Sequence, residues 1–163
     1  MTGASITQPA RVRRDRTAIR RSNPSRPVRL AVSDGLIHNE TSVFDYGCGH
    51  GDDLRYLSSL GIACAGWDPV FATQESPTEA DLVNLGYVVN VIEDSTERVR
   101  VLRDAWSLAR RLLIVAARLS LEADLPSRLN CFADGFLTTR GTFQKLFEQH
   151  DADQLMGPGR RPE

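Results

Sequence analysis

Val-Phe-Asp-Tyr-Gly-Cys-Gly-His-Gly-Asp-Asp, from Val43 to Asp53, is the stretch of the sequence that decides the fold. Two apolar residues lead into Asp45, and glycine then stands at every second position, at Gly47, Gly49 and Gly51. Glycine adopts positive φ and lets the backbone approach a neighbour closely, because no Cβ intervenes. Leucines then recur at helical spacing, so the free N–H groups of a helix point back at the turn. The stretch therefore predicts a buried strand, a ligand-binding turn and a helix in succession.

An acid followed by three alternating glycines resembles the first motif of class I S-adenosylmethionine-dependent methyltransferases. The pattern differs from the dinucleotide fingerprint G-x-G-x-x-G, because the third glycine comes one residue early. An NAD(P)-dependent oxidoreductase, which shares the α/β architecture, is therefore the less favoured alternative. The resemblance implies that the loop wraps the methionine and ribose portions of S-adenosyl-L-methionine, the expected cofactor. It implies six cofactor-binding residues in the loop: Asp45, Tyr46, Gly47, Cys48, Gly49 and Gly51.

The composition is that of an ordinary soluble globular protein of one domain. The 163 residues are 41% hydrophobic and 25% charged, with a net charge of -1. No run reaches the length of a transmembrane span and the N-terminus lacks an apolar signal-peptide core, which favours a cytoplasmic protein without membrane contact. The cysteines share no C-x-x-C spacing and the histidines are scattered, so we expect no metal site.

Positive charge is concentrated near the N-terminus. Eight arginines and a single acid lie between Arg11 and Arg29, although the whole chain is slightly acidic. Arginine pairs bidentately with phosphate and with carboxylate. One hypothesis is a nucleic-acid-binding arm with salt-sensitive contacts that do not depend on sequence, and the other is a solvated leader that packs on the acidic body. The candidate DNA contacts are Arg11, Arg13, Arg14, Arg16, Arg20 and Arg21.

A second acid follows the next predicted strand, which covers residues 62–67. Asp68 and Pro69 come about 20 residues after the glycine loop, where such folds fix the ribose hydroxyls of a cofactor. A carboxylate accepts hydrogen bonds from both hydroxyls and the proline ends the strand, so both residues are predicted to bind the cofactor. Residues 70–80 hold little apolar material, so the third strand of the usual fold is expected to be short or absent. Val70 and Phe71 are candidates to close the adenine pocket in its place.

The segment from Asp81 to Asp94 is expected to deliver residues to the reacting centre. It is typical of a buried strand that ends near Asn84 and is followed by a short turn and an acid, and it resembles the fourth motif of class I methyltransferases. The resemblance implies Asn84 and Tyr87 as catalytic candidates and Leu85 as a cofactor contact. Asn-Leu-Gly-Tyr is also similar to the tetrad of DNA amino-methyltransferases, which is an acid or asparagine, two prolines and an aromatic residue. This sequence has Leu85 and Gly86 in place of the two prolines. We therefore favour a pocket lined by Asn84, Tyr87 and Arg118 that does not copy that chemistry.

The rest of the chain continues the alternation of helix and strand. Apolar spacing predicts a helix over 95–109 with Val99, Leu102 and Trp106 on its inner side, and the apolar run 112–117 predicts a buried strand after a turn at 110–111. Residues 136–147 predict a turn and a short helix that begins near Thr142. The fold class is therefore α/β: a Rossmann-like class I methyltransferase sheet, mostly parallel and incomplete. Its third strand is short or absent and its C-terminal strand pair is missing.

Several blocks together resemble one family, the DNA phosphorothioation-associated methyltransferases. The blocks are residues 16–21, 25–28, 43–49, 66–69, 83–94 and 142–145. The resemblance implies DNA modification or restriction as the setting, with DNA and proteins of a phosphorothioation system as partners. Members of this family are longer, so we expect a truncated member. A catalytically inactive remnant that binds the cofactor or DNA is therefore the alternative to an active methyltransferase.

These expectations divide the chain into three parts. Residues 1–24 are a basic, partly disordered N-terminal arm. Residues 25–148 are an S-adenosylmethionine-binding, methyltransferase-like domain. Residues 149–163, which are polar and have no core pattern, are a disordered tail.

Overall fold

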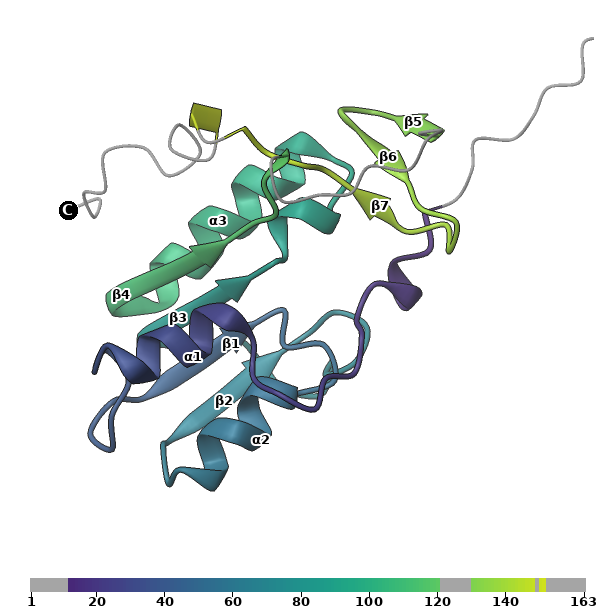
Figure 1. Ribbon diagram of the computed structural model, residues 1–163. Helices are drawn as coiled ribbons and strands as arrows, with labels where there is room; N and C mark the ends of the chain where they lie inside the picture. The colour runs from purple at the N-terminus through teal and green to yellow at the C-terminus, as the bar shows by residue number, and fades with distance from the viewer. Residues whose placement is uncertain (1–11, 121–129, 149, 152–163) are drawn as a thin grey trace, which may run out of the picture.

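A parallel four-stranded sheet forms the centre of the protein (Figure 1). The structure is a computed structural model that describes residues 12–120, 130–148 and 150–151. The strands lie in the order β2-β1-β3-β4, where β1 is Val43–Tyr46, β2 is Cys64–Trp67, β3 is Ala80–Gly86 and β4 is Ala109–Ala116. The winding of the chain reverses between β1 and β3, and this reversal leaves a crevice at the carboxyl ends of these two strands.

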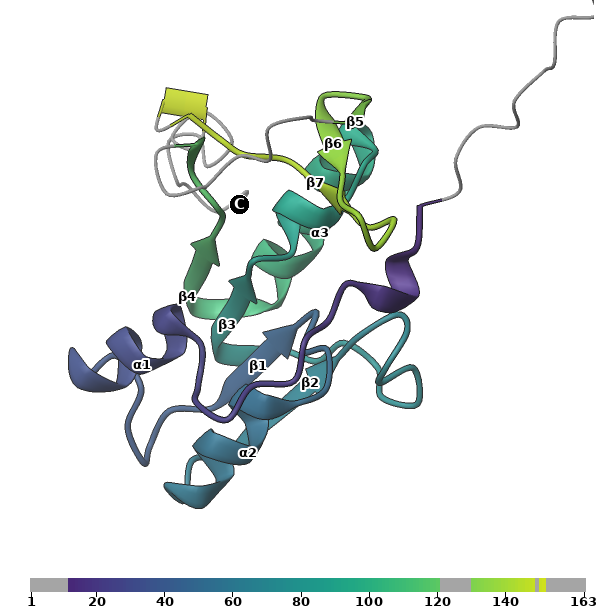
Figure 2. The ribbon, with the colours of Figure 1, turned by 45° about the vertical axis from the view of Figure 1, so that its right-hand side comes forward.

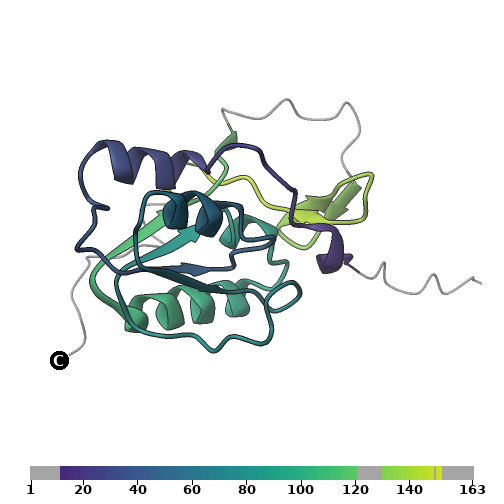
Figure 3. The same ribbon diagram turned by 90° about the horizontal axis from the view of Figure 1, so that it is seen from below.

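Helices cover both faces of this sheet (Figure 3). The helices α1 (Arg26–Ser33) and α2 (Asp52–Ser59) lie on one face, and α3 (Ser95–Leu108) lies on the other. Successive residues of a strand alternate between two cores, so that Val43 packs in the core beside α1 and α2 while Phe44 packs in the core beside α3. Both faces are covered, and β1 is accordingly buried at every position. The predicted α/β class, with a mostly parallel and incomplete sheet, is confirmed.

The chain between β2 and β3 forms no third strand of this sheet. In the described residues the segment makes a single antiparallel bridge, between Asp68 and Ala72. The two strands that it connects are both neighbours of β1, and β2 forms one edge of the sheet. The expectation of a short or absent third strand is therefore confirmed.

A second, three-stranded antiparallel sheet lies beside the 3-10 turn η2 (Val89–Val91) (Figure 2). Its strands are β5 (Asn130–Phe132), β6 (Gly135–Leu137) and β7 (Phe143–Gln144). The prediction of a turn and a short helix over 136–147 is therefore wrong. Leu137 and Phe143 face each other across β6 and β7 and are both buried, so the apolar residues of this segment follow the pairing of strands and not a helical period.

Two strands of the main sheet are longer than predicted. β4 begins at Ala109, directly after α3, so Arg110 and Arg111 belong to the strand and not to a turn. β3 continues to Gly86, which pairs with Ala116 of β4. The predicted end of β3 near Asn84 is therefore wrong, because the polar residue lies inside the paired strand.

The inner side of helix α3 is only partly the one predicted, and Trp106 is half-buried. Leu102 is buried as expected, but Val99 is 41% exposed and Arg98 is buried beside it. The guanidinium of Arg98 donates to the Ile92 carbonyl at 2.6 Å and pairs with Asp134 of the small sheet. A buried charge needs such partners, and here they also connect the small sheet to α3.

The chain before α1 runs across the carboxyl end of the main sheet (Figures 1 and 2). It includes the 3-10 turn η1 (Arg14–Arg16), and the Arg13 N–H donates to the Gly141 carbonyl of the small sheet at 2.8 Å. The predicted arm therefore contacts the body within its described part. Residues 1–11 and, apart from His150 and Asp151, the predicted tail lie outside the described residues. No helix within the described ranges is long and apolar enough to cross a membrane.

Candidate functional site

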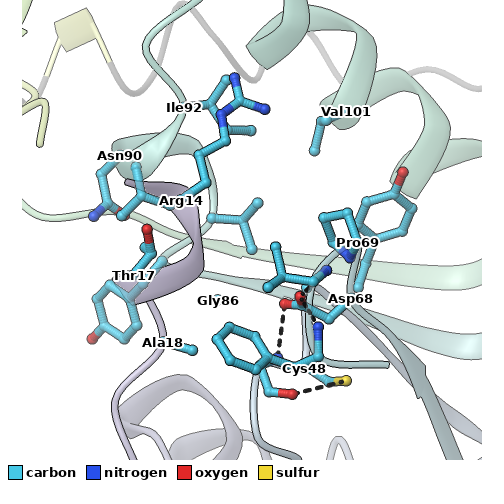
Figure 4. Close-up of a pocket in the computed structure, with 18 of the residues that line it drawn as sticks. Arg14, Thr17, Ala18, Cys48, Asp68, Pro69, Gly86, Asn90, Ile92 and Val101 are labelled. Atoms are coloured by element: carbon cyan, nitrogen blue, oxygen red, sulfur yellow. Dashed lines mark hydrogen bonds between the residues drawn. The ribbon is translucent and has the colours of Figure 1, made fainter. Parts of the chain in front are cut away.

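A cavity of about 710 Å³ lies at the carboxyl ends of β1, β2 and β3 (Figure 4). Its walls come from the arm before α1, the glycine loop after β1, the turn after β2, the segment after β3 and one side of α3, with single residues from the segment after β4 and from β7. Pockets for small molecules and cofactors have volumes of roughly 300–1,000 Å³. The cavity also lies at the point where the strand order reverses, which is where open α/β sheets bind their ligands.

The glycine loop folds in the way its spacing predicts. Gly47, Gly49 and Gly51 all have positive φ, of 82°, 54° and 73°. The N–H groups of Gly47 and Cys48 donate to the Trp67 carbonyl at 2.8 and 3.1 Å, which fixes the loop to β2. Gly47 and Gly49 line the cavity, whereas Gly51 caps the start of α2 and does not line it.

Tyr46 and Cys48 also line the cavity. The ring of Tyr46 meets that of Trp67 edge to face, with the centroids 5.3 Å apart, and the two rings form an apolar wall. Burial raises the pKa of the Cys48 thiol to about 12, with smaller contributions from the carboxylates of Asp45 and Asp68. The thiol therefore stays neutral at physiological pH and is a packing group, not a nucleophile.

We expect Gly47→Ala to destabilise the protein by about 3 kcal/mol, because it adds a steric clash to left-handed backbone strain. A Cβ at this position would lie 2.5 Å from Val88 Cγ2, and φ is 82°. Gly61→Ala is the matched control, since φ is 74° there and nothing lies within 4 Å of the added Cβ. Strain alone should cost that variant about 1–2 kcal/mol. Urea denaturation measures both losses, and equal values would contradict the close packing of the loop on Val88.

Asp68 lies where the sequence predicts a ribose contact, at the carboxyl end of β2. It is 9% exposed and lines the cavity together with Pro69. Its Oδ2 accepts a hydrogen bond from the Gly49 N–H at 3.0 Å, and its Oδ1 accepts from the N–H groups of Val70 and Phe71 at 2.8 and 3.0 Å. A carboxylate has about four acceptor positions, so Oδ2 retains one for a ligand hydroxyl. Asp68 therefore fixes the loop and also offers an acceptor to the cavity.

The turn after Asp68 contributes an apolar wall. Val70 and Phe71 both line the cavity, and the Phe71 ring lies 4.4 Å from the ring of His50 in the glycine loop. An aromatic pair of this kind suits a planar ring, so the adenine contact predicted for Val70 and Phe71 stays a prediction that their placement allows.

Asp45, Asn84 and Leu85 lie beneath the cavity and do not line it. Asp45 and Asn84 are 4% and 1% exposed, and the Asn84 Nδ2 donates to Asp45 Oδ1 at 2.8 Å between neighbouring strands. Burial raises the pKa of Asp45 to about 7. Leu85 belongs to the core beside α3. Asp45 lies in β1, and Asn84 and Leu85 lie in β3; none of the three belongs to the cavity lining, and their contacts with cofactor or substrate stay a prediction.

Tyr87, the other predicted catalytic residue, lines the cavity just beyond β3. Its φ of 62° is unfavourable for a residue with a Cβ, and its N–H donates to the Ala116 carbonyl at 2.7 Å. Strained conformations of this kind cluster at functional sites. Arg118 lines the cavity, as do Asn90 and Gln144, which the sequence analysis did not identify. Their side chains are joined by a 3.2 Å hydrogen bond across 54 residues of sequence, so no local pattern indicates them.

The arm before α1 forms the remaining wall and contributes Arg14, Thr17, Ala18, Ile19 and Arg21. Three of the predicted DNA contacts pair with acids of the same chain. Arg13 pairs with Asp15, Arg14 with Glu93 and Glu97, and Arg21 with Asp53. Arg16 and Arg20 are exposed and form no ion pair with a described residue, and Arg11 lies outside the described ranges.

The chemical groups around the cavity suit an organic ligand. Among residues 12–120, 130–148 and 150–151, no three metal-binding side chains come together. The cavity presents closely spaced backbone glycines, the Asp68 carboxylate with a spare acceptor position and several aromatic rings. Groups of this kind bind a molecule that carries hydroxyls and a planar ring.

A sheet in the order β2-β1-β3-β4, with a glycine loop after β1 and an acid after β2, is the core of the class I methyltransferase fold. A solved structure with this fold is the Burkholderia thailandensis 1,6-didemethyltoxoflavin-N1-methyltransferase with bound 1,6-didemethyltoxoflavin and S-adenosylhomocysteine. It superimposes with a TM-score of 0.55 at 16% sequence identity, over 80% of this chain and 64% of that one. At this identity the likeness shows the fold.

A second similar structure is magnesium protoporphyrin IX methyltransferase from Synechocystis with bound S-adenosylmethionine. Its TM-score is 0.49 at 19% identity, over 80% of this chain and 63% of that one. This chain therefore matches less than two thirds of the length of either solved structure. No protein-family model matches the sequence, and no curated protein matches it.

Proposed function

We propose that this chain is an S-adenosylmethionine-dependent methyltransferase. The main support is the arrangement of Asp68 and Gly49, because one carboxylate oxygen holds the glycine loop and keeps an acceptor position at the cavity. Ribose hydroxyls are the ligand groups that such a carboxylate recognises in folds of this class. The likeness to the fold of solved methyltransferases supports the same reaction class.

The residues around the cavity fit this cofactor in three respects. Gly47 and Gly49 allow the backbone of the loop to approach the methionine and ribose portions. Asp68 can accept hydrogen bonds from the ribose. Phe71 and His50 form an aromatic wall for the adenine ring, in the region where the usual third strand is absent.

The cofactor supplies a methyl group on a sulfonium, which is already a good leaving group. The chain then has to align the acceptor with that group, exclude water and accept a proton where the acceptor is an amine or a hydroxyl. Tyr87, Asn90 and Arg118 are polar residues placed for these tasks, since all three line the cavity, the first two after β3 and Arg118 after β4. Asp45 is buried below the cavity and is not placed to act as the base.

We propose DNA modification linked to phosphorothioation as the setting of this reaction. The support comes from the sequence blocks that resemble the phosphorothioation-associated family and from the exposed Arg16 and Arg20 of the arm. Both arginines are available to pair with backbone phosphates, whereas Arg14 and Arg21 are already paired with carboxylates. Contacts of this kind are salt-sensitive and do not depend on sequence.

Calorimetric titration of the full chain with S-adenosylmethionine tests the cofactor, with NAD as the control ligand. We expect saturable binding of S-adenosylmethionine and no heat from NAD. Transfer of a radiolabelled methyl group to DNA, with and without phosphorothioate linkages, then tests the acceptor. A folded chain that does not bind S-adenosylmethionine would overturn the proposal. Binding without transfer to either DNA would favour the inactive cofactor-binding remnant.

A further inference from the structure

Residues 13–21 cross the mouth of the cavity as a strap (Figure 4). Five of these nine residues line the cavity, although they precede the first strand of the sheet by more than twenty positions. Figures 1 and 2 show the strap passing from the small sheet toward α2, over the carboxyl ends of β1 and β2. The strap therefore closes a cavity whose other walls come from the main fold and, at Gln144, from the small sheet.

The N-terminal end of the strap is held mainly by Arg14. Its Nη1 and Nη2 donate to the two carboxylate oxygens of Glu97 at 2.9 and 2.6 Å, and its Nε donates to Glu93 Oε2 at 3.1 Å. Such a bidentate pair is stronger and more directional than an ordinary ion pair. The hydrogen bonds from Arg14 lower the pKa of Glu97, which is consistent with a pair that forms in the folded state. Arg14 therefore connects the strap to the start of α3.

The other end of the strap is held by the first turn of α2. The Arg21 N–H donates to Asp52 Oδ2 at 2.7 Å, and the Arg21 guanidinium pairs with Asp53 at 3.0 Å. Asp53 also accepts a hydrogen bond from the Ser25 N–H at 2.6 Å. The side chain of Asp53 is 4% exposed, whereas those of Glu93 and Glu97 are each 24% exposed. The Arg14 end is therefore the weaker and more salt-sensitive of the two.

Between these ends the strap rests on the glycine loop. Residues 18–20 form no hydrogen bond with any described residue. A Cβ at Gly49 would lie only 3.0 Å from Ala18 Cβ, so the two segments are in close contact. The middle of the strap is thus kept in place by its ends and by this contact.

We propose that Arg14 is a positioning residue that holds the strap against the glycine loop and sets the rate at which bound cofactor leaves. This inference rests on the proposed function. A ligand between the loop and the strap is enclosed by both, so its departure requires the strap to lift. Lifting begins at the more exposed end, where the pairs of Arg14 with Glu93 and Glu97 must break.

The dissociation rate of S-adenosylmethionine from the full chain, measured by stopped-flow displacement, tests this role. Arg14→Glu should raise that rate roughly tenfold, because it removes an ion pair and adds repulsion. The triple variant Arg14→Glu/Glu93→Arg/Glu97→Arg should restore a rate near that of the wild type. Arg29→Glu, with the same charge change at an exposed position of α1 that does not line the cavity and forms no ion pair with a described residue, should leave the rate unchanged. Added salt should speed release from the wild type and not from Arg14→Glu.

An unchanged dissociation rate in Arg14→Glu, or an equal increase in Arg29→Glu, would overturn the proposal. Failure of the proposed function gives a different result, because then no variant binds S-adenosylmethionine. Hydrogen exchange then tests whether Arg14 holds the strap in place, since the Thr17 and Arg21 N–H groups are both hydrogen-bonded in the closed strap. Faster exchange of these two amides in Arg14→Glu alone would support the role of Arg14 in holding the strap. Equal exchange in all variants would overturn that role.

Discussion

We expect Asp68→Ala to weaken the binding of S-adenosylmethionine by roughly 10- to 100-fold. A hydrogen bond to a charged group contributes about 1.5–3 kcal/mol, and the carboxylate is the group expected to accept from the ribose. The substitution also removes the acceptor of three backbone N–H groups, those of Gly49, Val70 and Phe71. The glycine loop and the turn after β2 then lose the side chain that connects them. Calorimetric titration measures the affinity, and circular dichroism verifies that the variant is folded.

Two further variants separate the loss of a ligand contact from a general loss of structure. Asp34→Ala removes an exposed acid at the end of α1 and should leave the affinity unchanged. Asp68→Asn keeps an oxygen for Val70 and Phe71 but can place an NH₂ group opposite the Gly49 N–H, so it should bind with intermediate affinity. An affinity of Asp68→Ala within about fivefold of the wild type would show that this carboxylate does not hold the ligand.

The parts of the site that the sequence predicts well are those in which one local segment supplies both the backbone geometry and the functional group. The glycine loop is such a segment, since Gly47 and Gly49 stand where positive φ is required. Asp68 is another, because a strand that ends in an acid followed by a proline places the carboxylate at the sheet edge wherever the strand pairs. Neither inference needs a partner from elsewhere in the chain.

The incorrect predictions concern residues whose environment is set by distant partners. Asn84 is typical of a strand end when considered alone, but it lies inside β3 because its amide hydrogen-bonds to Asp45, 39 residues earlier. Arg98 can be buried on the inner side of α3 only because its guanidinium hydrogen-bonds to the Ile92 carbonyl and pairs with Asp134. Residues 136–147 carry apolar side chains that fit a helix or a hairpin, and pairing with neighbouring strands decides between the two.

The partners of the charged residues in the arm are equally hard to predict from the sequence. Eight arginines between Arg11 and Arg29 indicate an anionic partner, and the sequence offers nucleic acid and the acidic body as alternatives. Arg14 finds its carboxylates 79 and 83 residues away, at Glu93 and Glu97. Such pairs join two segments that are separated in the sequence by three strands of the sheet. Part of the arm is therefore a wall of the site, and its exposed arginines stay the candidates for DNA.

Asp45→Asn is expected to stabilise the protein above neutral pH, by on the order of 4 kcal/mol at pH 8. Burial raises the pKa of Asp45 from its ordinary value of 3.8 to about 7, so the folded protein favours the neutral carboxyl. The stability associated with this group is therefore fully present below pH 3.8 and is lost as the pH rises to 7. Asparagine is neutral at every pH, keeps the volume and can still accept the hydrogen bond from Asn84. Urea unfolding between pH 4 and pH 8 should show a falling stability in the wild type and a flatter profile in the variant.

Asp81→Asn is the matched control, because the pKa of Asp81 is lowered in the folded protein whereas that of Asp45 is raised. Hydrogen bonds from Ser42 lower the pKa of Asp81 to about 2, so the stability associated with this carboxylate is present above pH 3.8 and is lost as the pH falls toward 2. The control variant should therefore lose stability at neutral pH and leave the slope between pH 4 and pH 8 unchanged. If Asp45→Asn shows the slope of the wild type over that range, the carboxyl beneath the glycine loop is ionised in the folded protein. Its interaction with Asn84 would then be a charged hydrogen bond, and the floor of the cavity would carry a negative charge.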